Sequence, residues 1–394
     1  MENIISSNDK SVKTLPKGYI LGVPVWGDDY VKQFLEISLP SLLSPRNLPV
    51  LQGRPICKFN IYTKSEWVNT IKQASTITYL TKFIEVKIHE LDLDTSNRYY
   101  GMNEGHRLCL EEANGLDCAS MMLSADHIYS DGYVEFLVNK AEEGYRVVSL
   151  IGLRTNRNSM GTFVKNNFKT GEVITISPRQ LVKAAVNNLH EINEYSFMDS
   201  NRSLIQPSSL FWTVGKSGEI LAHCYHQSPV MVYPEIKNQT FKGTIDDDLV
   251  TSVFKIFPKD YVIANSDECI MIDLCQEGRE VPLIEKEISQ IAHWVFYNTN
   301  IYHKRIFEFK LRLHFGEAKE EEWIIAEQKA KKVLEKIKNR IEIITLKTKV
   351  EKNEELLNSL THRIETIDRS LRPYYKLKKL FSFIKSLLQN SKPV

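Results

Sequence analysis

The sequence has no apolar run long enough to cross a membrane. A transmembrane helix needs roughly 18 consecutive apolar residues, and no stretch of the 394 residues approaches that length. Residues 1–17 are polar, lack the apolar core of a secretion signal, and are expected to be a flexible N-terminus. The six cysteines form no C-x-x-C pair and no zinc-like spacing. These features predict a cytoplasmic protein with reduced, mostly buried thiols.

The chain also lacks a strong excess of charge of one sign. Its net charge is +2, with 25% charged and 42% hydrophobic residues, which is ordinary for a globular protein and gives no indication of nucleic-acid binding. No G-x-G-x-x-G motif follows any expected strand, which counts against a methyltransferase or a dehydrogenase. The length predicts one large domain with an appendage.

Between residues 18 and 153 the pattern alternates between short apolar segments and segments with helical spacing. This alternation predicts a mostly parallel sheet with helices on both faces, the α/β class. The expected strands are 19–25, 59–63, 84–91, 119–124 and 146–151, and the expected helices are 31–42, 67–82, 102–114 and 132–143.

The region from 154 to 315 is less regular and is assigned to the same domain, 18–315. Residues 163–176 are expected to form a hairpin that turns at 169–171. Ser177, Pro178 and Gln180 form the pattern of a capping box at a helix start. Strand-like pieces recur at 210–214, 230–233 and 261–264.

A change of composition marks the C-terminal tail. Residues 317–371 contain no glycine or proline, and apolar residues recur there at alternating spacings of three and four. This spacing predicts a coiled-coil region, 316–371, through which copies associate into a homo-oligomer. The alternative is a pair of amphipathic helices packed on their own domain. One run is Ala330, Leu334, Ile337, Ile341 and Ile344, and a second, after a register shift near 347–353, is Leu357, Leu360, Ile364, Ile367 and Leu371.

Basic and aromatic residues alternate in the last segment, 372–394. The pattern is typical of a short amphipathic helix that lies in an anionic membrane surface, here the inner face of the cell membrane. Docking of this helix on the protein's own body is the alternative. The cations are Arg372, Lys376, Lys378, Lys379 and Lys385, and the apolar residues are Tyr374, Tyr375, Leu377, Leu380, Phe381, Phe383, Ile384, Leu387 and Leu388.

Residues suited to ligand binding follow the expected strands. Ligands of open parallel sheets bind at the carboxyl ends of the strands. The first strand ends in Val25, Trp26 and Gly27, the helix before the fourth strand carries Asn103 and Arg107, and Asp126 follows the fourth strand. We expect these six residues to bind a donor nucleotide. In the alternative interpretation Trp26 is a core aromatic, Arg107 lies on a solvated helix face and Asp126 caps the next helix.

The segments 22–30, 39–43 and 124–127 resemble the nucleotide-holding strand, helix and D-x-D motif of GT-A glycosyltransferases. The resemblance covers about residues 18–275, and the motif here contains one aspartate, Asp126. It implies a divalent cation, Mn²⁺ or Mg²⁺, bound by Asp126 and by a C-terminal histidine, for which His226 or His223 is the candidate.

Three adjacent acids, Asp246, Asp247 and Asp248, form the candidate catalytic group. One of them is expected to deprotonate the acceptor hydroxyl, and Asp247 is preferred because the middle acid of such a turn can point away from its neighbours. The acids could equally bind metal or cap a solvated loop.

The resemblance implies a glycosyltransferase that moves a sugar from a nucleotide-diphosphate donor to a glycan or lipid-linked acceptor, such as lipopolysaccharide, in bacterial surface polysaccharide synthesis. Two alternatives are a coiled-coil scaffold with an inactive sheet domain and a nucleotidyltransferase. The latter usually has a glycine-rich loop with a basic residue after the first strand, whereas residues 23–30 contain one glycine and neither lysine nor arginine.

Overall fold

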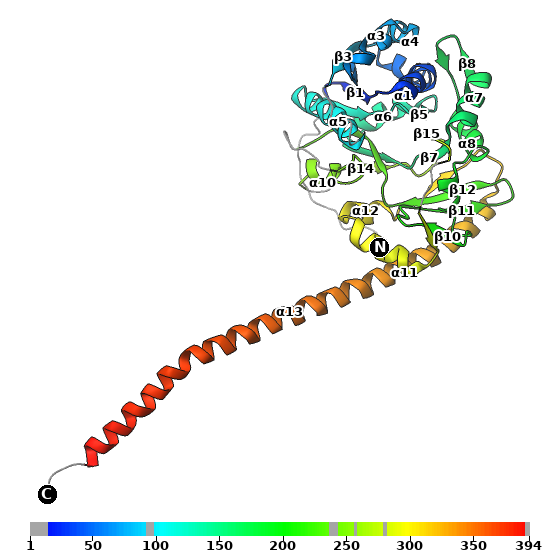
Figure 1. Cartoon of the computed structure of the whole chain (residues 1–394). Coiled ribbons are helices and arrows are strands. Elements are labelled where there is room, and N and C mark those ends of the chain that lie inside the picture. Colours follow the sequence, from blue (N-terminus) through cyan, green and yellow to red (C-terminus); the bar gives the residue numbers. More distant parts are fainter. Residues whose placement is uncertain (1–14, 92–97, 236–242, 256–257, 279–281, 391–394) are drawn as a thin grey trace. The chain divides into compact units, whose positions relative to one another are not determined.

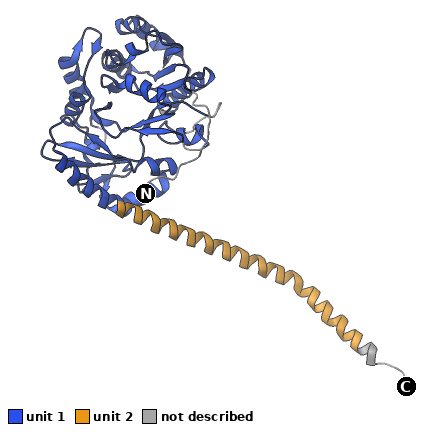
Figure 2. Ribbon diagram, turned by 180° about the vertical axis from the view of Figure 1, so that it is seen from behind, with its two compact units in different colours: residues 1–334 blue, residues 335–394 orange. Residues whose placement is uncertain are grey.

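The computed structural model describes residues 15–91, 98–235, 243–255, 258–278 and 282–390. The chain divides into two compact units, residues 1–334 and 335–394 (Figure 2). Most of the expected flexible N-terminus, and residues 391–394 of the expected membrane segment, lie outside the described residues.

A seven-stranded sheet forms the centre of the first unit (Figure 1). The strand order is β14-β6-β13-β4-β1-β2-β3, and every neighbouring pair is parallel except those made by β13. The strands are β1 Tyr19–Pro24, β2 Cys57–Thr63, β3 Glu85–Glu90, β4 Ala119–Met122, β6 Val147–Leu150, β13 Ser228–Val232 and β14 Asp260–Val262.

Helices cover both faces of this sheet, because alternate residues of its buried strands point to opposite sides. Leu21 of β1 belongs to the main core cluster, to which Leu42, Leu80 and Leu137 contribute from the helices on that face. Ile20 packs on the other face with Cys109. The helices of the first face include α1 Asp28–Gln33, a π-helical turn Phe34–Ser38, α2 Leu39–Leu42, α3 Ser65–Gln73, α4 Ser75–Leu80 and α6 Tyr133–Glu142, and those of the second are α5 Arg98–Gly115, α10 Leu249–Val253 and α12 Ile301–Ile306.

The structure confirms the predicted α/β class with a mostly parallel sheet and a C-terminal helix. The helix predicted from the Ser177 capping box is also confirmed: it is α8, Pro178–Val186, and the reciprocal bonds between Ser177 and Gln180 are present. The hairpin predicted at 163–176 is partly wrong. Residues up to Phe168 belong to α7, Arg157–Phe168, and only β8 Lys169–Thr170 and β9 Val173–Ile174 pair around the turn.

Smaller sheets flank the central one. A three-stranded sheet has the order β5-β15-β7, another has the order β11-β12-β17, and β10 pairs with β16. Their strands are β5 His127–Tyr129, β7 Leu153–Asn156, β15 Met271–Cys275, β11 Ser209–Val214, β12 Glu219–Cys224, β17 Leu311–Leu313, β10 Arg202–Leu204 and β16 Leu283–Glu285; the remaining helices are a 3₁₀ turn Leu48–Leu51, α9 Glu191–Glu194 and α11 Ile288–Asn298.

One continuous helix, α13 Glu320–Asn390, forms the C-terminal part of the chain. Its start belongs to the first unit, where Trp323, Ala326 and Ala330 are buried. Ala330 therefore packs on its own domain. The prediction that the intermolecular seam begins at Ala330 is wrong. The second run is exposed throughout, from Leu357 to Leu371. Among the described residues, no helix is long and apolar enough to cross a membrane.

Candidate functional site

The order of the central sheet creates a topological switch point between β1 and β4. The chain runs outward from β1 to β2 and β3 on one side, and then crosses over to place β4 on the other side. At such a point the loops after the two strands diverge and leave room for a ligand at the carboxyl edge. The candidate site is therefore the edge formed by the loops that follow β1 and β4.

The loop after β1 contains the first predicted donor-binding residues. Val25 is buried in the core, and its N–H donates to the carbonyl of Tyr62 at 2.8 Å. Trp26 and Gly27 are partly exposed, and Gly27 has a φ of 83° as it turns the chain into α1. Trp26 is thus the member of this group whose side chain is available to a ligand.

Helix α5 brings two unsatisfied polar atoms to the same region. Asn103 Oδ1 and His106 Nδ1 are buried, and neither has a hydrogen-bond partner. His106 Nε2 donates to the carbonyl of Leu123 at 3.1 Å, and burial lowers the pKa of this histidine to about 4. Arg107 is engaged differently, because its guanidinium bonds to Glu104 and Glu111 on its own helix.

A row of charges crosses the small sheet directly beyond β4. Asp273 of β15 pairs in register with His127 of β5 on one side and with Arg154 of β7 on the other. His127 Nε2 lies 3.0 Å from Asp273 Oδ1, and Arg154 Nε lies 4.0 Å from Asp273 Oδ2. We call Arg154, Asp273 and His127 the charged row. Asp126, the predicted metal and donor ligand, directly precedes it, with its Oδ1 4.0 Å from His127 Nε2.

The charged row shifts the pKa values of its members. Burial alone would lower the pKa of His127, but the carboxylates of Asp273 and Asp126 outweigh burial and raise it. Burial would raise the pKa of Asp273, but His127 and Arg154 hold it below its ordinary value. Asp126 has a raised pKa because burial outweighs the attraction of His127 and Arg157, yet its side chain is 34% exposed. The row thus favours a protonated His127 beside an accessible carboxyl group.

Arg157 joins this row to the loop after β1. It begins α7, its Nη1 lies 3.7 Å from Asp29 Oδ2, and its guanidinium carbon lies 4.8 Å from the ring centre of Tyr30. Its Nε is buried without a partner, although guanidinium donors are normally paired when buried.

Sequence reasoning missed four members of this site: His127, Arg154, Arg157 and Asp273. Two signals were present in the sequence. Asp273 is a lone acid within an otherwise apolar strand, and both arginines follow the fifth expected strand closely.

The other predicted residues lie in a second cluster. His226 Nε2 donates to the carbonyl of Asn298 at 3.2 Å, and its ring contacts those of Trp294 and His303. His303 donates to the carbonyl of Asp246 at 2.8 Å and accepts the N–H of Asn300, so it holds the acidic turn in place. His223, the alternative metal ligand, is buried and bonds to the carbonyl of Phe307 at 2.9 Å.

The three acids of the turn differ in their contacts. Asp246 accepts a hydrogen bond from the hydroxyl of Thr244, and Asp248 accepts the N–H of Gly243 at 3.1 Å. Asp247 is the most exposed of the three residues, and partial burial of its carboxyl group together with the charge of Asp248 raises its pKa. The carboxylate of Asp247 lies against Gly243 of the same turn, and it is the one of the three for which no hydrogen bond within the turn is found among the described residues.

Cys224 provides an electrostatic link between the two clusters. The pKa of its thiol is raised to about 11, chiefly by burial; among the smaller contributions, the charge of Asp246 acts in the same direction and the charge of Arg154 opposes it. The acidic turn and the charged row therefore lie close enough for one thiol to respond to both.

The residues of the site fit a divalent cation poorly. Mg²⁺ and Mn²⁺ prefer carboxylate ligands, but Asp273, the carboxylate next to Asp126 in the site, is engaged by His127 and Arg154. The side-chain contacts found for His226 lie in the second cluster. Within the parts of the chain that the structure describes, no three His, Cys, Asp or Glu side chains come together as a metal-binding group. Cation binding by Asp126 and His226 stays a prediction.

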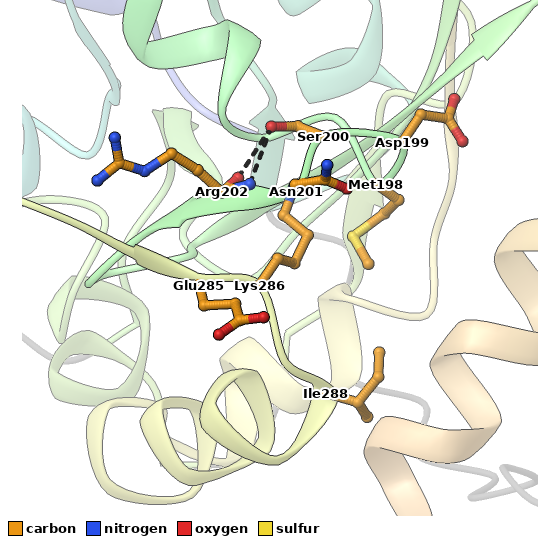
Figure 3. A pocket seen from close by; sticks show the side chains of 8 residues that line it. All are labelled: Met198, Asp199, Ser200, Asn201, Arg202, Glu285, Lys286 and Ile288. Atoms are coloured by element: carbon orange, nitrogen blue, oxygen red, sulfur yellow. Dashed lines mark hydrogen bonds between the residues drawn. The ribbon is translucent and has the colours of Figure 1, made fainter.

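An open cavity of about 690 Å³ lies elsewhere, lined by residues around β10, β16 and the start of α11 (Figure 3). None of the residues predicted from the sequence lines it. Burial lowers the pKa of its Lys286 to about 8, but the ammonium donates to the carbonyls of Tyr195 and Phe197 and so fastens neighbouring segments together.

Comparison with solved structures finds a candidate glucose-1-phosphate thymidylyltransferase from Bacillus anthracis, crystallised with sucrose. The two chains are 15% identical, and the match covers 36% of this chain and 56% of the other, with a TM-score of 0.21. No family model and no curated protein matches the chain. A likeness this low carries no argument about fold or function.

The charged row makes a prediction about pH. In wild type His127 should titrate above pH 6.5, and Asp273→Asn should bring its pKa below 6.5, because burial then acts with less opposition. The pair should stabilise the fold fully below pH 6.5, and this contribution should be lost as the pH rises through the folded pKa of His127. The lowered pKa of Asp273 adds stability that is lost only as the pH falls below 3.8.

Histidine ring signals followed by NMR, assigned with His127→Gln, measure this. Asp267→Asn is the control, because Asp267 pairs with a different histidine, His314, at 3.3 Å. A His127 signal that titrates identically in wild type and in Asp273→Asn would exclude the ion pair.

Proposed function

We propose that the protein is a glycosyltransferase and that its donor diphosphate binds between the loop after β1 and the charged row. The observation that supports this most is the convergence of Arg157, Arg154 and His127 at the topological switch point of the sheet. Guanidinium groups bind phosphate oxygens through paired hydrogen bonds. The Nε–H of Arg157, which is buried and has no partner, is the donor that we assign to such a bond.

In this proposal cationic side chains provide the positive charge that a metal would otherwise supply. Arg157 and Arg154 hold the diphosphate, and protonated His127 helps to stabilise the negative charge that develops as the sugar leaves. Asp126 binds a donor hydroxyl with its exposed carboxyl group, and Trp26 offers an aromatic face to the base. Asn103 and His106 supply further buried polar atoms at the same switch point.

Asp247 is the proposed general base. It deprotonates the acceptor hydroxyl, whose oxygen then attacks the anomeric carbon of the donor sugar while the bond to the nucleoside diphosphate breaks. The exposed carboxylate of Asp247 and its raised pKa suit this role, since a base works best when its pKa lies nearer the working pH.

The basic end of α13 is proposed to hold the enzyme at an anionic membrane surface, on the cytoplasmic face where a lipid-linked acceptor would be found. Its apolar residues are exposed, with Phe381 at 69% and Tyr374 at 64%. Together with the neighbouring lysines, they can enter the headgroup region without spanning the bilayer. We also expect copies of the chain to associate through the exposed part of α13.

Donor binding is tested by thermal shift with UDP- and GDP-sugars. At a donor concentration of about 100 times Kd, binding should add ~2.7 kcal/mol of stability and raise Tm by several degrees. Arg157→Ala and Asp126→Asn should lose this shift while their own Tm values stay within a few degrees of wild type. Lys165→Ala, on the same helix but paired with Glu36, should keep it. If no nucleotide sugar shifts the wild type, the scaffold alternative is favoured.

Removal of the base should affect turnover rather than donor binding. Asp247→Asn should lower kcat by about 10²–10⁴-fold, with the donor-induced thermal shift unchanged. Asp246→Asn and Asp248→Asn should instead lower Tm, because their carboxylates accept hydrogen bonds within the turn. A donor-hydrolysis or transfer assay on the three variants decides this, and turnover of Asp247→Asn within threefold of wild type would place the base elsewhere.

Membrane attachment is tested by sedimentation with liposomes. Lys378→Glu plus Lys379→Glu should release the protein from anionic vesicles, because each cation near the surface contributes ~1 kcal/mol. Lys331→Glu plus Lys332→Glu makes the same charge change at exposed positions earlier in α13 and should leave binding intact. Equal binding by all three proteins would show that this segment is not the anchor.

A further inference from the structure

The exposed part of α13 carries a single heptad pattern from residue 343 to 374. Because the helix is continuous, the register shift expected near 347–353 does not interrupt this pattern. Instead, the run that begins at the buried Ala330 has one heptad register, and a longer seam, residues 343–374, has another. In a heptad abcdefg, positions a and d form the seam. Here the a positions are Ile343, Val350, Leu357, Ile364 and Leu371, and the d positions are Leu346, Asn353, Leu360, Ile367 and Tyr374.

This seam is exposed along its whole length. Its aliphatic a and d residues have between 41% (Leu371) and 66% (Ile364) of their surface accessible. A long helix with an apolar stripe is stable in water only when the stripe is covered. A second copy of the same helix carries a stripe of matching length and spacing.

The charges beside the seam favour one alignment. In a parallel pair each g residue faces the e residue five positions later on the other helix. Each charged pair is then of opposite sign: Glu342 with Lys347, Lys349 with Glu354, and Arg363 with Asp368. In a fully overlapping antiparallel pair e faces e and g faces g, and the only opposite pair is Lys347 with Asp368.

Asn353 favours the same alignment. It is the one amide among the a and d positions of the seam. In a parallel, in-register pair the two copies of Asn353 face each other and their amides can bond, whereas any other alignment places each amide against an apolar residue. A single asparagine at an a position fixes register in this way, and we assign the same effect to Asn353 at d.

We propose that two copies of the chain form a parallel, in-register coiled coil through residues 343–374. The inference rests on the self-association proposed above and adds the partner, the extent and the alignment. The two-stranded form is based on the first heptad, in which Ile343 occupies a and Leu346 occupies d; the later heptads, with Leu357 and Leu371 at a and Ile367 at d, do not share this pattern.

Self-association is tested first, by sedimentation velocity of the full chain. The parent should be a dimer, and Leu360→Lys plus Ile364→Lys should make it a monomer by placing four charges in the seam. Asn358→Lys plus His362→Lys adds lysines at outer positions of the same turns and should remain a dimer. A monomeric parent would overturn self-association and alignment together, but it would leave the donor site untouched.

Alignment is tested by exchanging one charge pair. Lys349→Glu should place carboxylates opposite Glu354 on both sides of a parallel dimer and raise the dimer dissociation constant roughly threefold to tenfold at low salt. Adding Glu354→Lys should restore it. A dissociation constant unchanged by Lys349→Glu, or not rescued in the double variant, would overturn the parallel alignment and leave self-association standing.

Discussion

The close packing of α5 over β1 is the constraint on which the site depends. Gly22 lies in the middle of β1, and a Cβ at this position would lie 2.6 Å from both Cβ and Sγ of Cys109 on α5. Gly105 on the same helix faces Pro24, the last residue of β1, in a similar way, at 3.0 Å. Because these positions lack side chains, α5 can lie directly over the strand that ends in the candidate site. Asn103 and His106 reach the switch point only through this approach.

The charged row, which lies beyond β4 at the same edge of the sheet, allows a carboxylate to be buried in the site. An isolated buried carboxylate is costly, but Asp273 has a cationic neighbour on each flanking strand. Gly152 leaves room for it, since a Cβ there would lie 2.9 Å from Asp273 Oδ1. Asp273 therefore neutralises much of the charge of His127 and Arg154 in the absence of a ligand.

The order of the elements could be predicted from the sequence, whereas the contents of the site could be predicted only in part. Strands such as 59–63 and 119–124 were visible because each is a short apolar run bounded by polar residues. Asp126 was visible because it directly follows such a run. Asp273 and Arg154 were not, because Asp273 meets Arg154 on one side and His127 on the other only in a sheet whose three strands come from distant parts of the chain. Periodicity describes local structure and contains no information about that pairing.

In the C-terminal helix α13, the spacing of apolar residues could not predict which of them are buried. Spacings of three and four predicted a seam, but spacing alone could not distinguish Ala330, buried in its own domain, from Leu357, which is exposed. Only burial separates the two runs and shows that the unpartnered seam ends beside Pro373, next to the basic segment.

The alignment of two tails would also determine how they meet a membrane. In a parallel coil both copies of the basic segment leave the same end, so both can enter one bilayer surface. In an antiparallel coil they would leave opposite ends, and one membrane could bind only one of them. Two linked sites bind with an avidity 10²–10⁴-fold above that of one site when both can engage together. A single short amphipathic segment binds a membrane reversibly, so parallel pairing would convert weak attachment into stable attachment. In this proposal the charges that align the seam and the lysines that follow it would serve the same function at the membrane.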